Sequence, residues 1–217
     1  MPEFFISIYN FFLYNPITGL MMFFYKNTGN NLGFAIILLT IAVKLILMPF
    51  ERKSLKSQKE IAELQPKINE IQKRYKDDKE KQALELMDLY KNANINPFAS
   101  FSLLILQLPI LITLYQAIRE AATNPEINTI FLGIVSLKDP YLPLTLLVAV
   151  VQYFQISFSM SKSQKKAQGW MALFSPALMF FILLKFPSSI SLYIIVSSVF
   201  TILEQYFINK AHKEKHE

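Results

Sequence analysis

Long apolar stretches alternate with short polar segments along most of this chain of 217 residues. Five of the stretches approach or exceed the roughly 17–25 residues that a helix needs to cross a bilayer. They occupy residues 32–50, 98–120, 141–160, 170–186 and 189–208. Open sheet edges cannot satisfy their backbone groups in lipid, so the pattern predicts a bundle of five transmembrane helices. The expected fold class is therefore an all-α integral membrane protein.

Two further helical segments are expected outside these spans. Within residues 1–31 the apolar side chains repeat at the spacing of one helix face, which predicts an interfacial amphipathic helix. These side chains are Phe4, Phe5, Ile8, Phe11 and Phe12. Residues 51–97 are polar, with apolar residues at helical spacing on both sides of a charged turn, which predicts an antiparallel helical hairpin.

The predicted hairpin has two explanations, a solvated coiled-coil spacer or a docking element for a partner or substrate. Pro66 should break or kink its first arm, because proline removes a helix hydrogen bond and crowds the preceding turn. The helix of the first span is therefore expected to run to about Leu64. The candidate residues of the hairpin are Pro66, Tyr75, Asp77, Asp78 and Tyr90.

Basic residues are distributed unevenly among the loops. Residues 51–97 carry eleven Lys and Arg, and residues 161–169 and 209–217 carry three each. Residues 1–31 and 121–140 carry only Lys26 and Lys138. The positive-inside rule therefore predicts an N-terminus outside the cell, and it predicts that 51–97, 161–169 and the C-terminal tail lie in the cytoplasm. The net charge of +6 then reflects topology, and specific nucleic-acid binding is not expected.

A lone lysine, Lys44, lies inside the first apolar stretch with no acidic residue to pair it locally. An ammonium in hydrocarbon costs roughly 2.5–3.5 kcal/mol on insertion scales. Such a charge is expected to face a wet cavity or a partner. The alternative is a lysine near a helix end that reaches the lipid headgroups, because the polar segment opens at Glu51.

Polar side chains also form stripes on several spans. Gln152, Gln155 and Ser159 follow the spacing i, i+3, i+7 of one helix face. Interhelical hydrogen bonds, worth roughly 0.6–2 kcal/mol each, would explain any single glutamine. The charge of Lys44 favours a hydrated groove for the whole set. The expected substrate-binding groove comprises Thr40, Lys44, Gln107, Gln152, Gln155, Ser159, Ser197, Ser198 and Thr201.

Signals for catalysis are weak. The chain contains no cysteine, which excludes thiolate metal sites and a cysteine nucleophile. His212 and His216 have a spacing that could ligate a metal on a helix, but they lie in a charged tail. Neither a phosphate-binding glycine loop nor a serine–histidine pair is present. We therefore expect no enzyme activity, no cofactor and no metal.

Several short motifs follow one another in a characteristic order. They are Tyr75-Lys-Asp-Asp-Lys, Leu89-Tyr-Lys, Asn94-Ile-Asn-Pro97, Gln107-Leu-Pro-Ile110 and Phe186-Pro-Ser-Ser-Ile-Ser-Leu-Tyr193, followed by Ser197 and Gln205-Tyr206. Their order and spacing resemble those of the YidC/Oxa/Alb insertase family over residues 15–208. Each motif is weak alone, and the combination is specific.

The resemblance implies a membrane protein insertase and chaperone of the bacterial inner membrane. It implies five spans around a groove open to cytoplasm and lipid, with Lys44 at a position where many members carry arginine. Lys44 would then attract acidic residues of the segment that is translocated. The implied partners are nascent membrane proteins and the bilayer, and the ribosome and the secretion translocon stay open as further partners. The tail after Asn209 is short, so ribosome binding through it is not expected.

The alternative function is a small solute transporter or channel. Transporters of that kind have inverted repeats with broken helices that meet at the midplane. The two halves of this sequence differ, and only one contains the polar hairpin segment. The sequence therefore favours the insertase.

Overall fold

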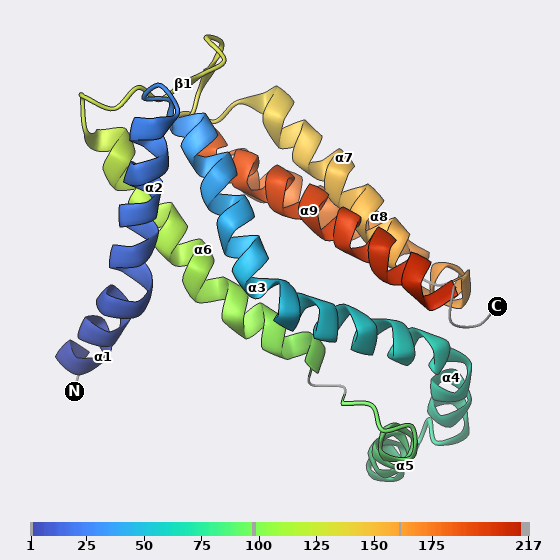
Figure 1. Cartoon of the computed structure of the whole chain (residues 1–217). Coiled ribbons are helices and arrows are strands. Elements are labelled where there is room, and N and C mark those ends of the chain that lie inside the picture. The colour runs from blue at the N-terminus through green and yellow to red at the C-terminus, as the bar shows by residue number, and fades with distance from the viewer. Residues whose placement is uncertain (1, 97–98, 161, 214–217) are drawn as a thin grey trace.

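The computed structural model describes residues 2–96, 99–160 and 162–213, and helices form most of it (Figure 1). The elements in chain order are α1 (Pro2–Tyr9), the π-helical turn η1 (Asn10–Tyr14), α2 (Asn15–Asn27), α3 (Leu32–Glu63), α4 (Gln65–Arg74), α5 (Lys79–Asn92), α6 (Ala99–Thr123), β1 (Ile130–Phe131), β2 (Val135–Ser136), α7 (Leu142–Ser159), α8 (Lys162–Leu183) and α9 (Ser188–Lys213). The helical class is confirmed. Pro97 of a predicted motif and His216 of the predicted tail lie outside the described residues.

Helix α3 is the central element, and it runs past its apolar stretch to Glu63, next to its expected end at about Leu64. Asn31 caps it by accepting hydrogen bonds from the backbone N–H groups of Gly33 and Phe34, at 3.0 and 3.3 Å. The helix continues through Pro49 to Glu63, and Figure 1 shows it bending near its middle. A proline inside a helix removes one backbone hydrogen bond and can kink the helix without ending it. The polar segment that opens at Glu51 is therefore the second half of the same helix.

The buried residues change from apolar to polar along the bundle. Helix α3 packs against α2, α6 and α9, and α7 packs against α8 and α9. The first half of α3 contributes apolar side chains to the core, including Leu32, Ile36 and Leu39. From Lys44 onward on α3 and from Ser198 onward on α9, the buried side chains are mostly polar or charged. The polar and charged ones are Lys44, Glu51, Ser54, Ser57, Ser198, Thr201, Glu204 and Gln205.

The apolar end of the bundle is closed by the segment between α6 and α7, where β1 and β2 form a short antiparallel hairpin. The strands were not expected from the sequence. Phe131 packs so closely on Gly33 that a Cβ atom there would lie 2.0 Å from its ring. Backbone bonds from Leu32 to Asn128 and from Ser188 to Asp139 tie the segment to the first turns of α3 and α9, at 3.3 and 3.0 Å.

The N-terminal segment packs against the bundle along α6. Tyr9 bonds Gln116 at 2.9 Å, and Tyr14 bonds Glu120. The bond to Glu120 and burial raise the pKa of Tyr14. Two of the aromatic residues that predicted an interfacial helix, Phe11 and Phe12, are about 70% exposed and do not pack in the core. These rings are therefore free to contact lipid.

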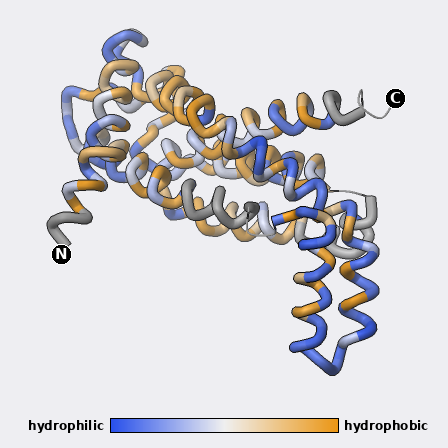
Figure 2. The backbone as a smooth tube through the Cα atoms, turned by 60° about the horizontal axis from the view of Figure 1, so that its bottom comes forward, coloured by the Kyte–Doolittle hydropathy of each residue, from blue (hydrophilic) through white to orange (hydrophobic). Residues whose placement is uncertain are grey.

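Helices α4 and α5 form a two-helix arm that projects from the bundle at the opposite end from β1 and β2 (Figure 1). Pro66 lies in the first turn of α4, where a missing N–H costs nothing, so it starts this helix and does not kink it. Helix α3 ends at Glu63, with Leu64 between the two helices. Figure 2 shows that the arm is mainly hydrophilic, whereas the bundle is mainly hydrophobic.

The outer surface of the bundle is strongly apolar. Among the described residues, three segments are long and apolar enough to cross a membrane: Leu32–Glu63, Leu142–Ser159 and Ser188–Asn209. A shorter apolar segment covers Ala172–Leu183. Large side chains of α7 and α8 point outward, among them Phe154, Trp170 and Phe181, each at least 60% exposed. Water does not favour such a surface, and lipid does.

Two predicted boundaries need correction. Residues 162–169, expected to be a loop, are the first two turns of α8, because nothing between Lys162 and Gly169 stops the helix. Helix α9 likewise continues to Lys213, into the expected tail. The turn between α8 and α9 is as short as Phe186-Pro187-Ser188 predicts.

Candidate functional site

An open cavity of about 700 Å³, lined by both polar and apolar side chains, lies between the helices of the bundle. Its walls come from α3 and α6 and from the three consecutive helices α7, α8 and α9. It is lined by Lys44, Glu51, Leu55, Gln58, Ile61, Gln107, Leu111, Gln152, Gln155, Ile156, Ser159, Met160, Met179, Tyr193, Ile194, Ser197, Ser198, Thr201 and Gln205. Eight of the nine predicted groove residues are in this set.

The predicted groove residue that the cavity does not include is Thr40. Its side chain is fully buried, and its hydroxyl donates a 2.6 Å hydrogen bond to the carbonyl of Ile36 in the previous turn. A threonine that bonds its own helix in this way satisfies its hydroxyl without a cavity. Thr40 therefore belongs to the packed core, one turn before Lys44.

Lys44 is paired, contrary to the expectation that no acidic residue lies near it. Its ammonium donates to Glu51 Oε1 at 2.7 Å and to Thr201 Oγ1 at 3.1 Å. The side chains of Lys44 and Glu51 are only 8% and 2% exposed. The first contact links two halves of α3, and the second links α3 to α9.

The sequence missed this ion pair because the apolar stretch was taken to end at residue 50. The helix in fact passes through Pro49, and residues seven apart in a helix lie on the same face, about two turns from each other. A long lysine side chain reaches across that distance. If the helix had been continued past Pro49, the spacing i, i+7 from Lys44 would have identified Glu51 as its partner.

A second carboxyl group lies behind this pair. Glu204 of α9 is 4% exposed and interacts electrostatically with Glu51, Lys44 and Arg52. Its carboxyl group lies against that of Glu51, and within the described part of the chain it accepts no hydrogen bond from a donor group. One ammonium thus faces two buried carboxyl groups.

Amide and hydroxyl groups complete the cavity wall and join its helices. Gln107 of α6 donates to the Tyr193 hydroxyl of α9, and Gln205 of α9 donates to Ser159 of α7. The Oγ1 atom of Thr201 also donates to the carbonyl of Ser197 at 3.1 Å. Both explanations of the polar stripes therefore apply, since the same residues bond between helices and line a cavity.

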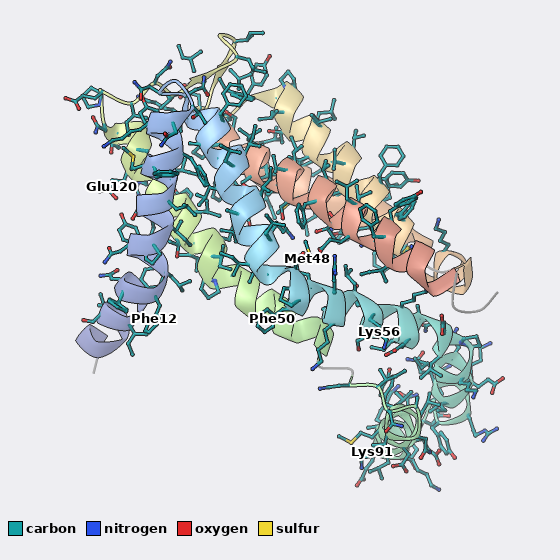
Figure 3. All side chains as sticks on the ribbon, viewed as in Figure 1. Phe12, Met48, Phe50, Lys56, Lys91 and Glu120 are labelled. Atoms are coloured by element: carbon teal, nitrogen blue, oxygen red, sulfur yellow. The ribbon has the colours of Figure 1, made fainter. Side chains whose placement is uncertain are left out.

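The cavity adjoins a smaller hollow of about 210 Å³ at the charged end of α3. The two share Leu55, Gln58, Ser159, Met160 and Gln205. The smaller hollow adds Lys59 and Glu63, residues of the polar half of α3. The polar space therefore extends toward the arm end of the molecule, away from the closed β1–β2 end. Figure 3 shows these two ends, with Glu120 near the β1–β2 end and Lys91 on the arm.

The predicted hairpin residues lie apart from the cavity, on the arm. Tyr75 follows α4 and its hydroxyl bonds Glu85 of α5 at 3.3 Å. Asp78 caps α5 by accepting from the Lys81 N–H at 3.0 Å, while Asp77 is exposed in the turn. Tyr90 is partly buried, which raises its pKa. These contacts fold the arm on itself and leave its apolar Leu84 and Met87 more than half exposed.

Metal-binding clusters of three or more His, Cys, Asp or Glu residues were not found among the described residues. The cavity instead combines one ion pair with amides and hydroxyls. Such a surface can solvate a polar segment, and it offers no obvious nucleophile activated by a base.

Comparison with known proteins points to a single family. The profile of the family described as 60Kd inner membrane protein matches residues 23–215. The membrane protein insertase YidC 2 of Listeria innocua is 34% identical over 93% of this chain and 72% of its own length. YidC insertases of Wolinella succinogenes and Citrifermentans bemidjiense are 34% and 33% identical over 94% and 90% of this chain.

The chain spans only 38% and 36% of the length of the last two proteins. A solved structure described as an active YidC insertase with its first transmembrane domain resolved superposes with a TM-score of 0.72. It is 28% identical and covers 89% of this chain and 46% of that one. These relatives favour the insertase reading of the sequence over the transporter or channel.

Proposed function

The chain belongs to the YidC/Oxa/Alb insertase family, and we propose that it inserts transmembrane segments of other proteins into the bacterial inner membrane and assists their folding. The observation that carries the proposal is the open cavity with buried polar and charged side chains in an apolar bundle, adjoined by a hollow toward the arm, while the β1–β2 segment is bonded to the opposite end of the bundle. The proposed reaction uses neither nucleotide nor cofactor.

The proposed membrane arrangement has five spans, namely the apolar half of α3 and helices α6, α7, α8 and α9. The basic residues of the arm support a cytoplasmic location for α4 and α5, and the few basic residues in 1–31 and 121–140 support an outer location for the N-terminus and for β1–β2. In this arrangement the cavity faces the cytoplasm. The N-terminal helix and the β1–β2 segment would cover the outer side.

In the proposed mechanism the cavity lowers the cost of moving a polar flank partway across the bilayer. Its amides, hydroxyls and Lys44–Glu51 pair supply both donors and acceptors, so the flank keeps hydrogen-bond partners as it leaves water. The apolar part of the substrate then enters lipid, where each buried CH₂ contributes about 0.8 kcal/mol. The protein needs only to reduce the barrier.

The cavity also offers a lateral exit route for the substrate. Two of its walls, α6 and α7, pack on different partners: α6 packs on α3 and α2, and α7 packs on α8 and α9. A substrate helix could therefore pass between α6 and α7 and leave the contacts of α6 with α3 and α2, and those of α7 with α8 and α9, intact. The arm, with its exposed Leu84 and Met87, would make the first contact with the incoming chain.

Cysteine labelling tests the orientation directly, because the native chain contains no cysteine. In intact cells, a membrane-impermeant maleimide should label Ile134→Cys, which is 76% exposed beside β2. It should label the arm variant Lys81→Cys only after the cells are broken. The reverse pattern would contradict the proposed topology.

Reconstitution tests the activity. Proteoliposomes that contain only this protein should insert a small single-span substrate, measured by protection of its translocated flank from protease, at least tenfold above empty liposomes. A requirement for the ribosome or the secretion translocon would appear as insertion only when that partner is supplied. Equal insertion into empty liposomes would contradict the proposal, and passage of small solutes instead would favour a channel.

A further inference from the structure

The charged groups that line the cavity cancel each other. Lys44 and Glu51 are the charged residues of the larger cavity, and Lys59 and Glu63 are those of the adjoining hollow. Each set pairs one positive with one negative residue. Glu204 adds a further carboxyl group behind the Lys44–Glu51 pair. The lining itself, to which Glu204 does not belong, is thus balanced, although Lys44 is a cation.

This balance changes what Lys44 can do. An acidic group on a substrate gains from Lys44 only if it takes the place of Glu51, which is held at 2.7 Å and is 2% exposed. If it does, the displaced Glu51 carboxylate loses its partner in a poorly solvated position. Breaking one buried ion pair to form another gives little net attraction. Glu204 stays beside the pair as a further carboxyl group that competes with a substrate acid for Lys44.

We propose that Glu51, supported by Glu204, is the residue that sets the charge preference of the cavity. It keeps Lys44 neutralised, so the cavity accepts translocated flanks made of uncharged polar residues as readily as acidic flanks. The proposal rests on the insertase function above and concerns its substrate class. It replaces the expectation that Lys44 itself selects acidic flanks.

Glu51 reaches this role from its place in the fold. The continuation of α3 past Pro49 places Glu51 about two turns beyond Lys44 on the same face of the helix, within reach of the long lysine side chain, which also contacts Thr201 of α9. An ammonium that bonds both a carboxylate and a hydroxyl has used two of its three donors. Only one N–H direction then remains for a substrate.

The test compares two single-span substrates that differ only in the translocated flank, which contains either four serines or four aspartates. Insertion into proteoliposomes is measured as the ratio of the acidic to the uncharged substrate. For the wild-type protein this ratio should lie within about threefold of one. A wild-type preference above about tenfold for the acidic flank would overturn the proposal without any variant.

Variants then separate the two carboxyl groups. Glu51→Gln combined with Glu204→Gln leaves Lys44 with no carboxylate, and the ratio should rise at least tenfold. Glu51→Gln alone should give a smaller rise, because Glu204 remains, and Glu204→Gln alone should leave the ratio near the wild-type value. An unchanged ratio in the double variant would overturn the proposal.

The matched control is Glu60→Gln, the same substitution on an exposed face of α3, where Glu60 lies 3.8 Å from Lys56. It should not change the ratio. Ratios are compared only for variants whose thermal unfolding in detergent matches that of the wild type. If a variant does not fold, the wild-type ratio alone tests whether the cavity accepts uncharged flanks as readily as acidic flanks. Failure of the wild type to insert the uncharged substrate would instead contradict the insertase function itself.

Discussion

Replacing Lys44 by methionine is expected to destabilise the protein by about 3–5 kcal/mol. The substitution keeps a long apolar side chain but leaves Glu51 and Glu204 buried together without a cation. Removing one partner of a buried ion pair has a cost of this size because the other charge stays uncompensated. Chemical unfolding in detergent micelles measures the change.

Two controls isolate the role of charge in this expected loss. Lys56→Met, at an ion pair 3.8 Å long and largely exposed on the same helix, should change stability by less than about 1 kcal/mol. Adding Glu51→Gln to Lys44→Met should recover part of the loss, because one buried carboxylate is removed. If Lys44→Met proves as mild as Lys56→Met, the pair contributes little and the cavity is solvated well enough to replace it.

Gly33→Ala is expected to destabilise the closed end by about 1–3 kcal/mol, the usual range for overpacking. Helix propensity alone predicts the opposite sign, since alanine is favoured over glycine in a helix by about 1 kcal/mol. The new Cβ would lie 2.0 and 2.5 Å from two ring atoms of Phe131, however, so the ring and its strand must move. Thermal unfolding in detergent provides the measurement.

Gly19→Ala is the matched control, because a Cβ at Gly19 of α2 meets no atom within 4 Å. It should be neutral or slightly stabilising. A combined Gly33→Ala and Phe131→Ala variant should lose less stability than the sum of the single changes, because Phe131→Ala removes the ring with which the new Cβ clashes. Strict additivity would mean that Phe131 does not press on Gly33.

Most of the polar residues that the sequence assigned to the groove line the cavity, but not all of them do. Gln152, Gln155 and Ser159 were assigned to one face from their spacing alone, and all three line the cavity. A helical period fixes which side chains share a face, whatever the rest of the fold does. Thr40 shares the face of Lys44 by the same rule, yet it is packed in the core. The helical repeat of about 3.6 residues predicts which side chains share a face, but it does not predict at which residue along the helix the cavity begins.

The sequence by itself determined that the chain is built from long apolar helices with a polar two-helix insertion, and it identified the family, because composition and period are local properties. The packing of distant segments decided the rest. The bend at Pro49 and the approach of α9 bring Glu51, Thr201 and Glu204 around Lys44. The charge that a substrate meets depends on these neighbours, since Coulomb interactions act through space and not along the chain.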